Sequence, residues 1–218
     1  MQKKILILGA GDHSKVVVET ILLTIPDCEI CLLDDIYSHL DKGQIKNKFS
    51  EYPLLGDLSI ALNESILNEF KAAFVAIGVS KVRLYWLKKL ESIGYDLPSF
   101  VHDSAWISPS ASLGKGTIIL AKSVLQTKAK LGDGVILNTS SSIDHHSKID
   151  DGAHICPGVH VAGNVSVGKR SLVGIGSTVI QNLSIGDDVI VGAGSVVIKD
   201  IPNSLTVAGV PSKIINKI

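Results

Sequence analysis

The sequence predicts an α/β unit followed by a parallel β-helix, and three observations lead to this fold class. Strand-like and helix-like segments alternate up to about residue 101. From residue 106 onward, an aliphatic residue recurs at every sixth position. The chain has 218 residues, which is enough for two domains, and 45% of them are hydrophobic. We therefore expect a Rossmann-like domain over residues 1–101 and a β-helix domain over residues 102–218.

The first half has the order of elements that is typical of a parallel sheet covered by helices. Apolar runs predict strands over residues 4–11, 29–35, 72–78 and 99–102. Apolar residues at helical spacing predict helices over residues 13–25, 58–70 and 81–94. Buried strands that alternate with helices favour a short Rossmann-like sheet.

The second half repeats with a period of six residues, which fits neither an α-helix nor an ordinary alternating strand. Sixteen aliphatic residues occur in register without an insertion: Ile107, Leu113, Ile119, Leu125, Leu131, Leu137, Ile143, Ile149, Ile155, Val161, Val167, Val173, Val179, Ile185, Val191 and Val197. Hexapeptide repeats indicate a parallel β-helix, in which three repeats make one coil of 18 residues. The repeats then give about five coils, stacked about 4.8 Å apart.

Glycine recurs directly after the aliphatic position, at residues 114, 132, 168, 174, 186 and 192. We expect these glycines to occupy corners of the coil, where a positive φ favours glycine.

The residue before each inward aliphatic residue points outward, and these residues sort onto three faces. A first face is polar, with Ser112, Lys130, Lys148, Ser166 and Ser184. A second face is apolar, with Ile118, Ile136, His154, Leu172 and Ile190. A third face is mixed, with Trp106, Val124, Ser142, His160, Thr178 and Val196. Since an exposed apolar stripe usually marks an interface, we expect the second face to pack on another copy of the chain.

The composition argues against several classes of protein. Lys plus Arg and Asp plus Glu are 21 each, so the chain has no basic surface for nucleic acid. The apolar run at the N-terminus is too short for a secretion signal or a membrane span, and we expect a soluble cytoplasmic protein.

Cys28 and Cys31 form a CxxC pair within an apolar run. We interpret them as buried free thiols in a reducing compartment, in preference to a redox or metal site.

Asp144, His145 and His146 interrupt the repeat, and three interpretations compete for them. A metal site is disfavoured, because adjacent histidines on an extended chain point apart and no third ligand recurs at a coil spacing. An exposed turn that tolerates histidine is a second interpretation. A catalytic base is the third, and it needs a histidine that reaches a substrate and a partner such as Asp144 that orients it. His145 and His154 lie on opposite sides of the prism, so a site that uses both is composed of two chains.

The stretches LGAGDHSKVV, LLDD, AIG, GVILNTSSSIDHHSKIDDGAHICPGVHVAGNVSVG and AGVPSK span nearly the whole chain. In this order they resemble the bacterial sugar O- and N-acyltransferases of the sialic acid O-acetyltransferase type. Within that family, the chain is most similar to the N-acetyltransferases that act on nucleotide-linked 4-amino sugars of the bacillosamine and perosamine pathways. The resemblance implies a left-handed β-helix, acetyl-CoA as co-substrate, no metal and a homotrimer with active sites between subunits.

The resemblance also implies roles for individual residues. His145 matches the catalytic base, and the backbone amide of Gly163 matches the donor to the thioester carbonyl. His154 matches a residue that binds acetyl-CoA, which is expected to lie along outward residues of later coils such as Ile175 and Ala193. The nucleotide-sugar site matches a set of residues in the first half and one in the second: Gly9, Gly11, Asp12, His13, Ser14, Asp34, Asp35, Gly78 and Asn138.

The sequence departs from the family at two places. The base is usually followed by a second acid, but here by His146, so His145 is oriented by another group or shares its proton with His146. The glycine loop reads Gly9, Gly11, Ser14 and is incomplete for a dinucleotide, although the following helix can offer amides to a phosphate. For Asp34 and Asp35, solvation of a strand end is the alternative interpretation.

The sequence therefore predicts N-acetylation of a nucleotide-linked 4-amino-4,6-dideoxy sugar by direct transfer, as a step of O-antigen or other glycan biosynthesis. O-acetylation of sialic acid or another hydroxyl is an alternative. A non-catalytic protein that binds nucleotide sugar or zinc is a second alternative.

Overall fold

The computed structural model describes residues 3–48 and 51–217. The chain divides at Pro98 and Ser99 into two compact units, and each is described by itself.

The first unit contains a four-stranded parallel sheet in the order β3-β2-β1-β4. Its strands are β1 (Lys4–Leu8), β2 (Glu29–Leu33), β3 (Leu54–Gly56) and β4 (Ala72–Val75). Its helices are α1 (Asp12–Thr24), α2 (Lys42–Lys48), α3 (Glu64–Phe70) and α4 (Ser80–Ile93), with 3-10 helices η1 (Asp35–His39) and η2 (Leu58–Leu62).

The two faces of this sheet pack against different helices, because successive strand residues point to opposite sides. Leu6 and Leu8 of β1 belong to one apolar cluster with Phe70 of α3 and residues of α4. The intervening residues of β1 are also buried, and so is the apolar face of α1. The sequence predicted this α/β arrangement.

Three details of the first unit differ from the predicted elements. The helix predicted over residues 58–70 is interrupted at Asn63, where the backbone is extended between η2 and α3. The polar segment after β2 contains α2 and β3, which the apolar pattern did not indicate. The strand predicted over residues 99–102 forms as Phe100–Val101, but it belongs to the second unit and pairs there with Ile118–Ile119.

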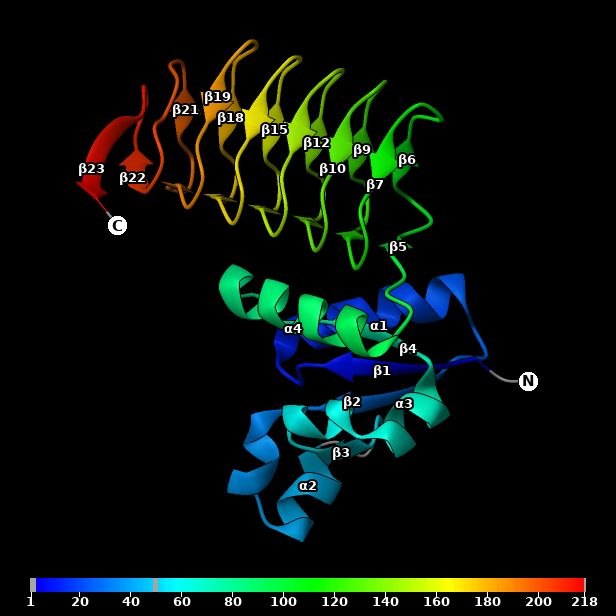
Figure 1. Ribbon diagram of the computed structural model, residues 1–218. Helices are drawn as coiled ribbons and strands as arrows, with labels where there is room; N and C mark the ends of the chain where they lie inside the picture. The colour runs from blue at the N-terminus through cyan, green and yellow to red at the C-terminus, as the bar shows by residue number, and fades with distance from the viewer. Residues whose placement is uncertain (1–2, 49–50, 218) are drawn as a thin grey trace. The chain divides into compact units, whose positions relative to one another are not determined.

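The second unit is a parallel β-helix whose coils stack in register (Figure 1). Its eight-stranded sheet contains β5 (Phe100–Val101), β8 (Ile118–Ile119), β11 (Ile136–Leu137), β14 (His154–Ile155), β17 (Leu172–Val173), β20 (Ile190–Val191), β22 (Leu205–Ala208) and β23 (Lys213–Lys217). Its six-stranded sheet contains β6 (Trp106–Ile107), β9 (Val124–Leu125), β12 (Ser142–Ile143), β15 (His160–Val161), β18 (Thr178–Val179) and β21 (Val196–Val197). Its five-stranded sheet contains β7 (Ser112–Leu113), β10 (Lys130–Leu131), β13 (Lys148–Ile149), β16 (Ser166–Val167) and β19 (Ser184–Ile185).

The interior of the β-helix confirms the hexapeptide register. Each of the sixteen aliphatic residues named from the sequence is in the core cluster or packs against it. Interior hydroxyls complete the packing, since each donates a hydrogen bond to a carbonyl 15 residues further on: Thr117, Ser123, Ser147, Ser171 and Ser177. These bonds join successive coils and satisfy polar groups that the core would otherwise leave unpaired.

The reason for the recurrent glycines is different from the predicted one. Positive φ occurs at other corner positions, for example at Lys128, His146, Asn164 and Asn182, which are 18 residues apart. The glycines after the aliphatic positions do not have positive φ. A Cβ at Gly168 would lie 2.5 Å from the backbone of the next coil, so close approach between coils requires glycine there.

The apolar stripe on the eight-stranded sheet is shorter than predicted. Ile118 and Ile136 are buried, and His154 and Leu172 are half-buried. Ile190 is the member of this set that is exposed, at 41%. The polar face is exposed as predicted.

Candidate active site

His145 lies at a corner of the β-helix, between β12 of the six-stranded sheet and β13 of the five-stranded sheet. Backbone hydrogen bonds hold this corner on both sides. The amide of His146 donates to the carbonyl of Thr127 one coil earlier, at 3.0 Å. The amide of Asn164, one coil later, donates to the carbonyl of His145 at 3.0 Å. The corner is therefore a fixed platform for an exposed histidine side chain.

The imidazole of His145 lies against Gly163, which occupies the same position one coil later. A Cβ at Gly163 would lie 2.6 Å from Nε2 and 3.0 Å from Nδ1 of His145. Thr127 and Gln181 occupy this position in other coils, so the backbone there accepts a side chain. Glycine is needed at residue 163 because the ring of His145 takes the space of a side chain.

The backbone amide of Gly163 has no hydrogen-bond acceptor within residues 3–48 and 51–217. Its carbonyl does have a partner, since it accepts from the amide of Asn182 at 3.1 Å. An amide without an internal acceptor, held beside an imidazole, can donate to an oxygen that develops negative charge. Both features fit the carbonyl of a thioester such as acetyl-CoA.

The rings of His145 and His146 contact each other, contrary to the expectation that adjacent histidines point apart. Their Nδ1 atoms are 3.1 Å apart, and the ring planes meet at 81°. The expectation assumed an extended backbone, but His146 has a φ of +60°. The carboxylate of Asp144 accepts a hydrogen bond from the backbone amide of His145 at 2.6 Å. The ring of His145 therefore contacts His146, and not Asp144 as expected.

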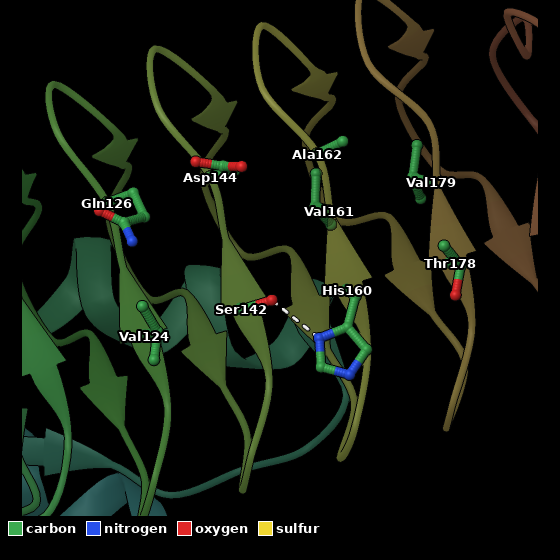
Figure 2. Close-up of a pocket in the computed structure, with 9 residues that line it drawn as sticks. All are labelled: Val124, Gln126, Ser142, Asp144, His160, Val161, Ala162, Thr178 and Val179. Atoms are coloured by element: carbon green, nitrogen blue, oxygen red, sulfur yellow. Dashed lines mark hydrogen bonds between the residues drawn. The ribbon is translucent and has the colours of Figure 1, made fainter.

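A hollow of about 280 Å³ lies on the six-stranded sheet beside this corner (Figure 2). Gln126, Asp144 and Ala162 form one row of its lining, in successive coils. Ser142 and His160 belong to a second row on neighbouring strands, and the Oγ of Ser142 is 2.8 Å from Nδ1 of His160. The sequence analysis assigned Ser142 and His160 to the mixed face and gave them no role. Neighbouring coils form the hollow together, so the hexapeptide repeat contains no signal for it.

His154, Ile175 and Ala193 lie on another side of the prism. His154 is in β14 of the eight-stranded sheet, and its Nε2 is 3.1 Å from Nδ2 of Asn138. Ile175 and Ala193 are exposed at successive corners between the eight-stranded and six-stranded sheets. The corner of His145 is opposite the eight-stranded sheet. One chain therefore does not bring His145 together with His154.

The glycine loop of the first unit is joined to the end of β2 by Asp34. One carboxylate oxygen of Asp34 accepts from the amide of Ala10 at 2.7 Å, and the other accepts from the amide of Ile36 at 2.9 Å. Asp35 accepts from the amide of Leu58 at 3.0 Å. Both acids thus hold the backbone, and Asp34 fixes the loop at the carboxyl edge of the sheet.

Three of the predicted substrate residues, Gly11, Asp12 and Ser14, line a pocket of about 360 Å³ at the N-terminus of α1. Gly11 precedes the helix, and the buried Oγ of Ser14 donates to its carbonyl at 2.6 Å. Gly9 has a φ of +108°, which favours glycine at this turn. The pocket is placed where an α/β sheet usually binds a nucleotide.

Arg83 of α4 stabilises the other loop at this edge. Its side chain is buried, and Nη1 donates to the carbonyls of Ile77 and Gly78, both at 2.7 Å. Burial lowers the pKa of Arg83 to about 10. Burial, and to a smaller degree the charge of Arg83, lower the pKa of His13 below its usual value. His13 is therefore neutral near pH 7.

The thiols of the chain are not activated. Burial raises the pKa of Cys156 to about 11, and burial also raises the pKa values of Cys28 and Cys31. The three cysteines are free. In the described part of the chain, no group of three or more His, Cys, Asp or Glu side chains is arranged to hold a metal ion. None of the described helices is long and apolar enough to cross a membrane.

Comparisons with known proteins agree with this fold. Residues 4–90 match the family model of the PglD N-terminal domain. The acetyltransferase domain of PglB from Neisseria gonorrhoeae, solved in complex with acetyl coenzyme A, is 36% identical, with a TM-score of 0.89 over 99% of this chain and 100% of that chain. PerB from Caulobacter crescentus, solved in complex with CoA and GDP-perosamine, is 34% identical, with a TM-score of 0.87 over 98% of this chain and 97% of that chain. A comparison with curated proteins gives no match.

The coils and the similarity to these acetyltransferases thus define a left-handed β-helix acyltransferase built from hexapeptide repeats. Within that class, the two solved proteins align with both units of the chain. The chain belongs to the family of sugar acetyltransferases that join a PglD N-terminal domain to a left-handed β-helix.

Proposed function

We propose that the chain transfers an acetyl group from acetyl-CoA to the amino group of a nucleotide-linked 4-amino-4,6-dideoxy sugar. The observation that carries the proposal is the contact between the His145 ring and Gly163, whose amide lacks an internal acceptor. In this proposal, His145 is the base and the amide of Gly163 is the oxyanion donor, and one corner would supply both groups. The similarity to a protein solved with CoA and GDP-perosamine supports the choice of substrate class.

In the proposed reaction, the amine nitrogen attacks the carbonyl carbon of the thioester. As the new C–N bond forms, the nitrogen loses a proton to Nε2 of His145. The carbonyl oxygen gains negative charge and accepts a hydrogen bond from the amide of Gly163. The C–S bond then breaks, and the imidazolium returns its proton to the departing thiolate. The products are the amide and CoA, and His145 is again neutral.

A direct transfer is preferred to a covalent acetyl-cysteine intermediate. Cys156 is the one cysteine of the β-helix, and burial raises its pKa to about 11, so the thiol is protonated at neutral pH. A protonated thiol is a poor nucleophile, since the thiolate is the reactive form. The amine of the sugar is the nucleophile in this proposal.

The complete site needs two chains. CoA would contact His154, which Asn138 positions, and extend along Ile175 and Ala193. These residues lie on the opposite side of the prism from the corner that holds Gly163. A thioester bound along one chain would therefore react at His145 of a neighbouring chain. We propose a homotrimer, in which each of three grooves combines both groups.

The first unit would bind the nucleotide. The pocket at the N-terminus of α1 offers helix amides to a diphosphate, next to Gly11 and Ser14. Asp34 and Arg83 support this site by fixing the loops on which Gly9 and Gly78 lie. Asp12, His13 and Asp35 border the same edge. Because acetyl-CoA and nucleotide sugars are cytoplasmic metabolites, we place the reaction in the cytoplasm, within glycan biosynthesis.

The test is release of CoA from acetyl-CoA with UDP-, GDP- and dTDP-linked 4-amino sugars and with free sialic acid. We expect turnover with one amino sugar and a loss of at least about 100-fold in His145→Ala, since general bases contribute 10²–10⁴-fold. His102→Ala, which removes a histidine from the first coil, is the matched control and should keep activity. Turnover with sialic acid alone would assign O-acetylation instead. Full activity of His145→Ala would contradict the proposed site.

A further inference from the structure

We propose that His146 is a positioning residue, which accepts a hydrogen bond from Nδ1 of His145 and thereby directs Nε2 of His145 to the substrate. The inference rests on the proposed function and adds the second histidine to it. The Nδ1 atoms of the two rings are 3.1 Å apart, and the ring centroids are 5.3 Å apart.

The contact fixes where the protons are. A hydrogen bond between two imidazole nitrogens needs one donor and one acceptor, because a neutral imidazole has one of each. If Nε2 of His145 is to accept a proton, its own proton must be on Nδ1. Nδ1 of His145 is then the donor, and His146 accepts and carries its proton on Nε2.

The same hydrogen bond survives the reaction. When Nε2 of His145 takes the proton of the amine, the imidazolium still donates from Nδ1 to His146. The donor is then charged, so the bond becomes stronger in the step in which charge develops. His146 therefore holds the ring in one orientation and stabilises the imidazolium without a proton transfer of its own.

The backbone makes this contact without special strain on the site. His146 has a φ of +60°, and Lys128, Asn164 and Asn182 have nearly the same φ at the equivalent position of other coils. The fold thus imposes the conformation that turns the side chain of residue 146 toward the ring of residue 145.

No described carboxylate occupies the position that His146 has at the ring. The carboxylate of Asp144 accepts from the amide of His145. Equivalent positions in the adjacent coils hold Thr127 and Lys128 on one side and Gly163 and Asn164 on the other. The charge of Lys148, two residues beyond, is paired with Asp150 at 2.8 Å. The base is therefore a pair of imidazoles, and the adjacent carboxylate of Asp144 contacts the backbone instead of the ring.

The experiment compares His146→Asn and His146→Glu in the full-length protein. Asparagine suits this backbone, as Asn164 and Asn182 indicate, but it is too short to reach the ring of His145. Glutamate can reach the ring and accept from Nδ1. Lys128→Asn, at the equivalent position one coil earlier, controls for a general effect of changing this corner.

We expect kcat of His146→Asn to fall by about 10- to 100-fold, which is the range for removing the partner that orients a metal-binding histidine. KM for both substrates and the melting temperature should stay close to wild type. His146→Glu should recover most of kcat, with the acidic limb of its kcat/KM profile moved to higher pH by about one unit, since a carboxylate favours the imidazolium.

Wild-type kcat in His146→Asn, together with an inactive His145→Ala, would overturn the role of His146 and leave the proposed function in place. Full activity of His145→Ala would overturn both. An equal loss in His146→Asn and His146→Glu, with no change in the pH profile, would assign His146 a purely structural role and also contradict the proposal.

Discussion

Replacing Gly163 by alanine tests whether the contact between residues 145 and 163 is the reacting geometry. The new Cβ would lie 2.6 Å from Nε2 of His145, whereas ordinary contacts begin near 3.4 Å. The same Cβ would lie still closer to Cε1 of His145, so the ring must move by about 1 Å. Displacements of about 1 Å at a reacting group cost about 100-fold in rate, which corresponds to about 2.7 kcal/mol of activation free energy. We expect kcat of Gly163→Ala to fall by about this factor.

The stability of Gly163→Ala should change little, because Thr127 and Gln181 show that this corner accepts a side chain and because the exposed ring of His145 can be displaced toward solvent. Gly168→Ala is the contrasting variant. Its Cβ would meet the backbone of the next coil at 2.5 Å, and overpacking of this kind costs about 1–3 kcal/mol. Steady-state kinetics and thermal unfolding of both variants separate the two effects. Wild-type kcat in Gly163→Ala would refute the assigned geometry.

Two further predictions concern titratable groups. Cys156→Ala should keep kcat within about twofold, because a thiol with a pKa of about 11 is not the acyl carrier, and loss of activity at unchanged stability would contradict direct transfer. His13 has a pKa below 6.5 in the folded chain, so the unfolded chain binds more protons at this residue. The free energy of unfolding therefore falls as the pH falls from about 6.5 through the lowered pKa. Urea unfolding between pH 7.5 and 5 should therefore show a smaller loss for His13→Asn than for wild type, and equal losses would refute the lowered pKa.

The sequence alone predicted the β-helix down to the individual inward residue. The period of six arises because each hexapeptide places one aliphatic side chain in the core. Ile143 and Val161 each occupy such a position independently of the neighbouring repeats. The contact between residues 145 and 163 follows from the same register, so the sequence was sufficient to predict it. The role of glycine at residue 168 could not be predicted from the sequence, because it depends on how closely two coils approach each other.

The relation of His145 to His146 could not be predicted for a different reason. The side-chain directions of neighbouring residues depend on φ, and the expectation of opposite directions holds for extended backbone only. Glycine stands at many equivalent corner positions, but His146, Lys128 and Asn164 show that other residues adopt the same positive φ. In the first unit, β3 has three residues and forms by pairing with β2, and α2 lies in a polar segment, so the apolar pattern contained no signal for either element.

The stacked coils also have a consequence for how the enzyme loses its structure. Each coil contacts only the coil before it and the coil after it, so the β-helix is close to a one-dimensional array in which unfolding starts at an end and spreads inward. The antiparallel strand β23 pairs with β22 and covers one such end. His145 and Gly163 lie in central coils, between strands on both sides. The β-helix can therefore fray at its ends in mild denaturant while the geometry of the corner that holds His145 and Gly163 persists.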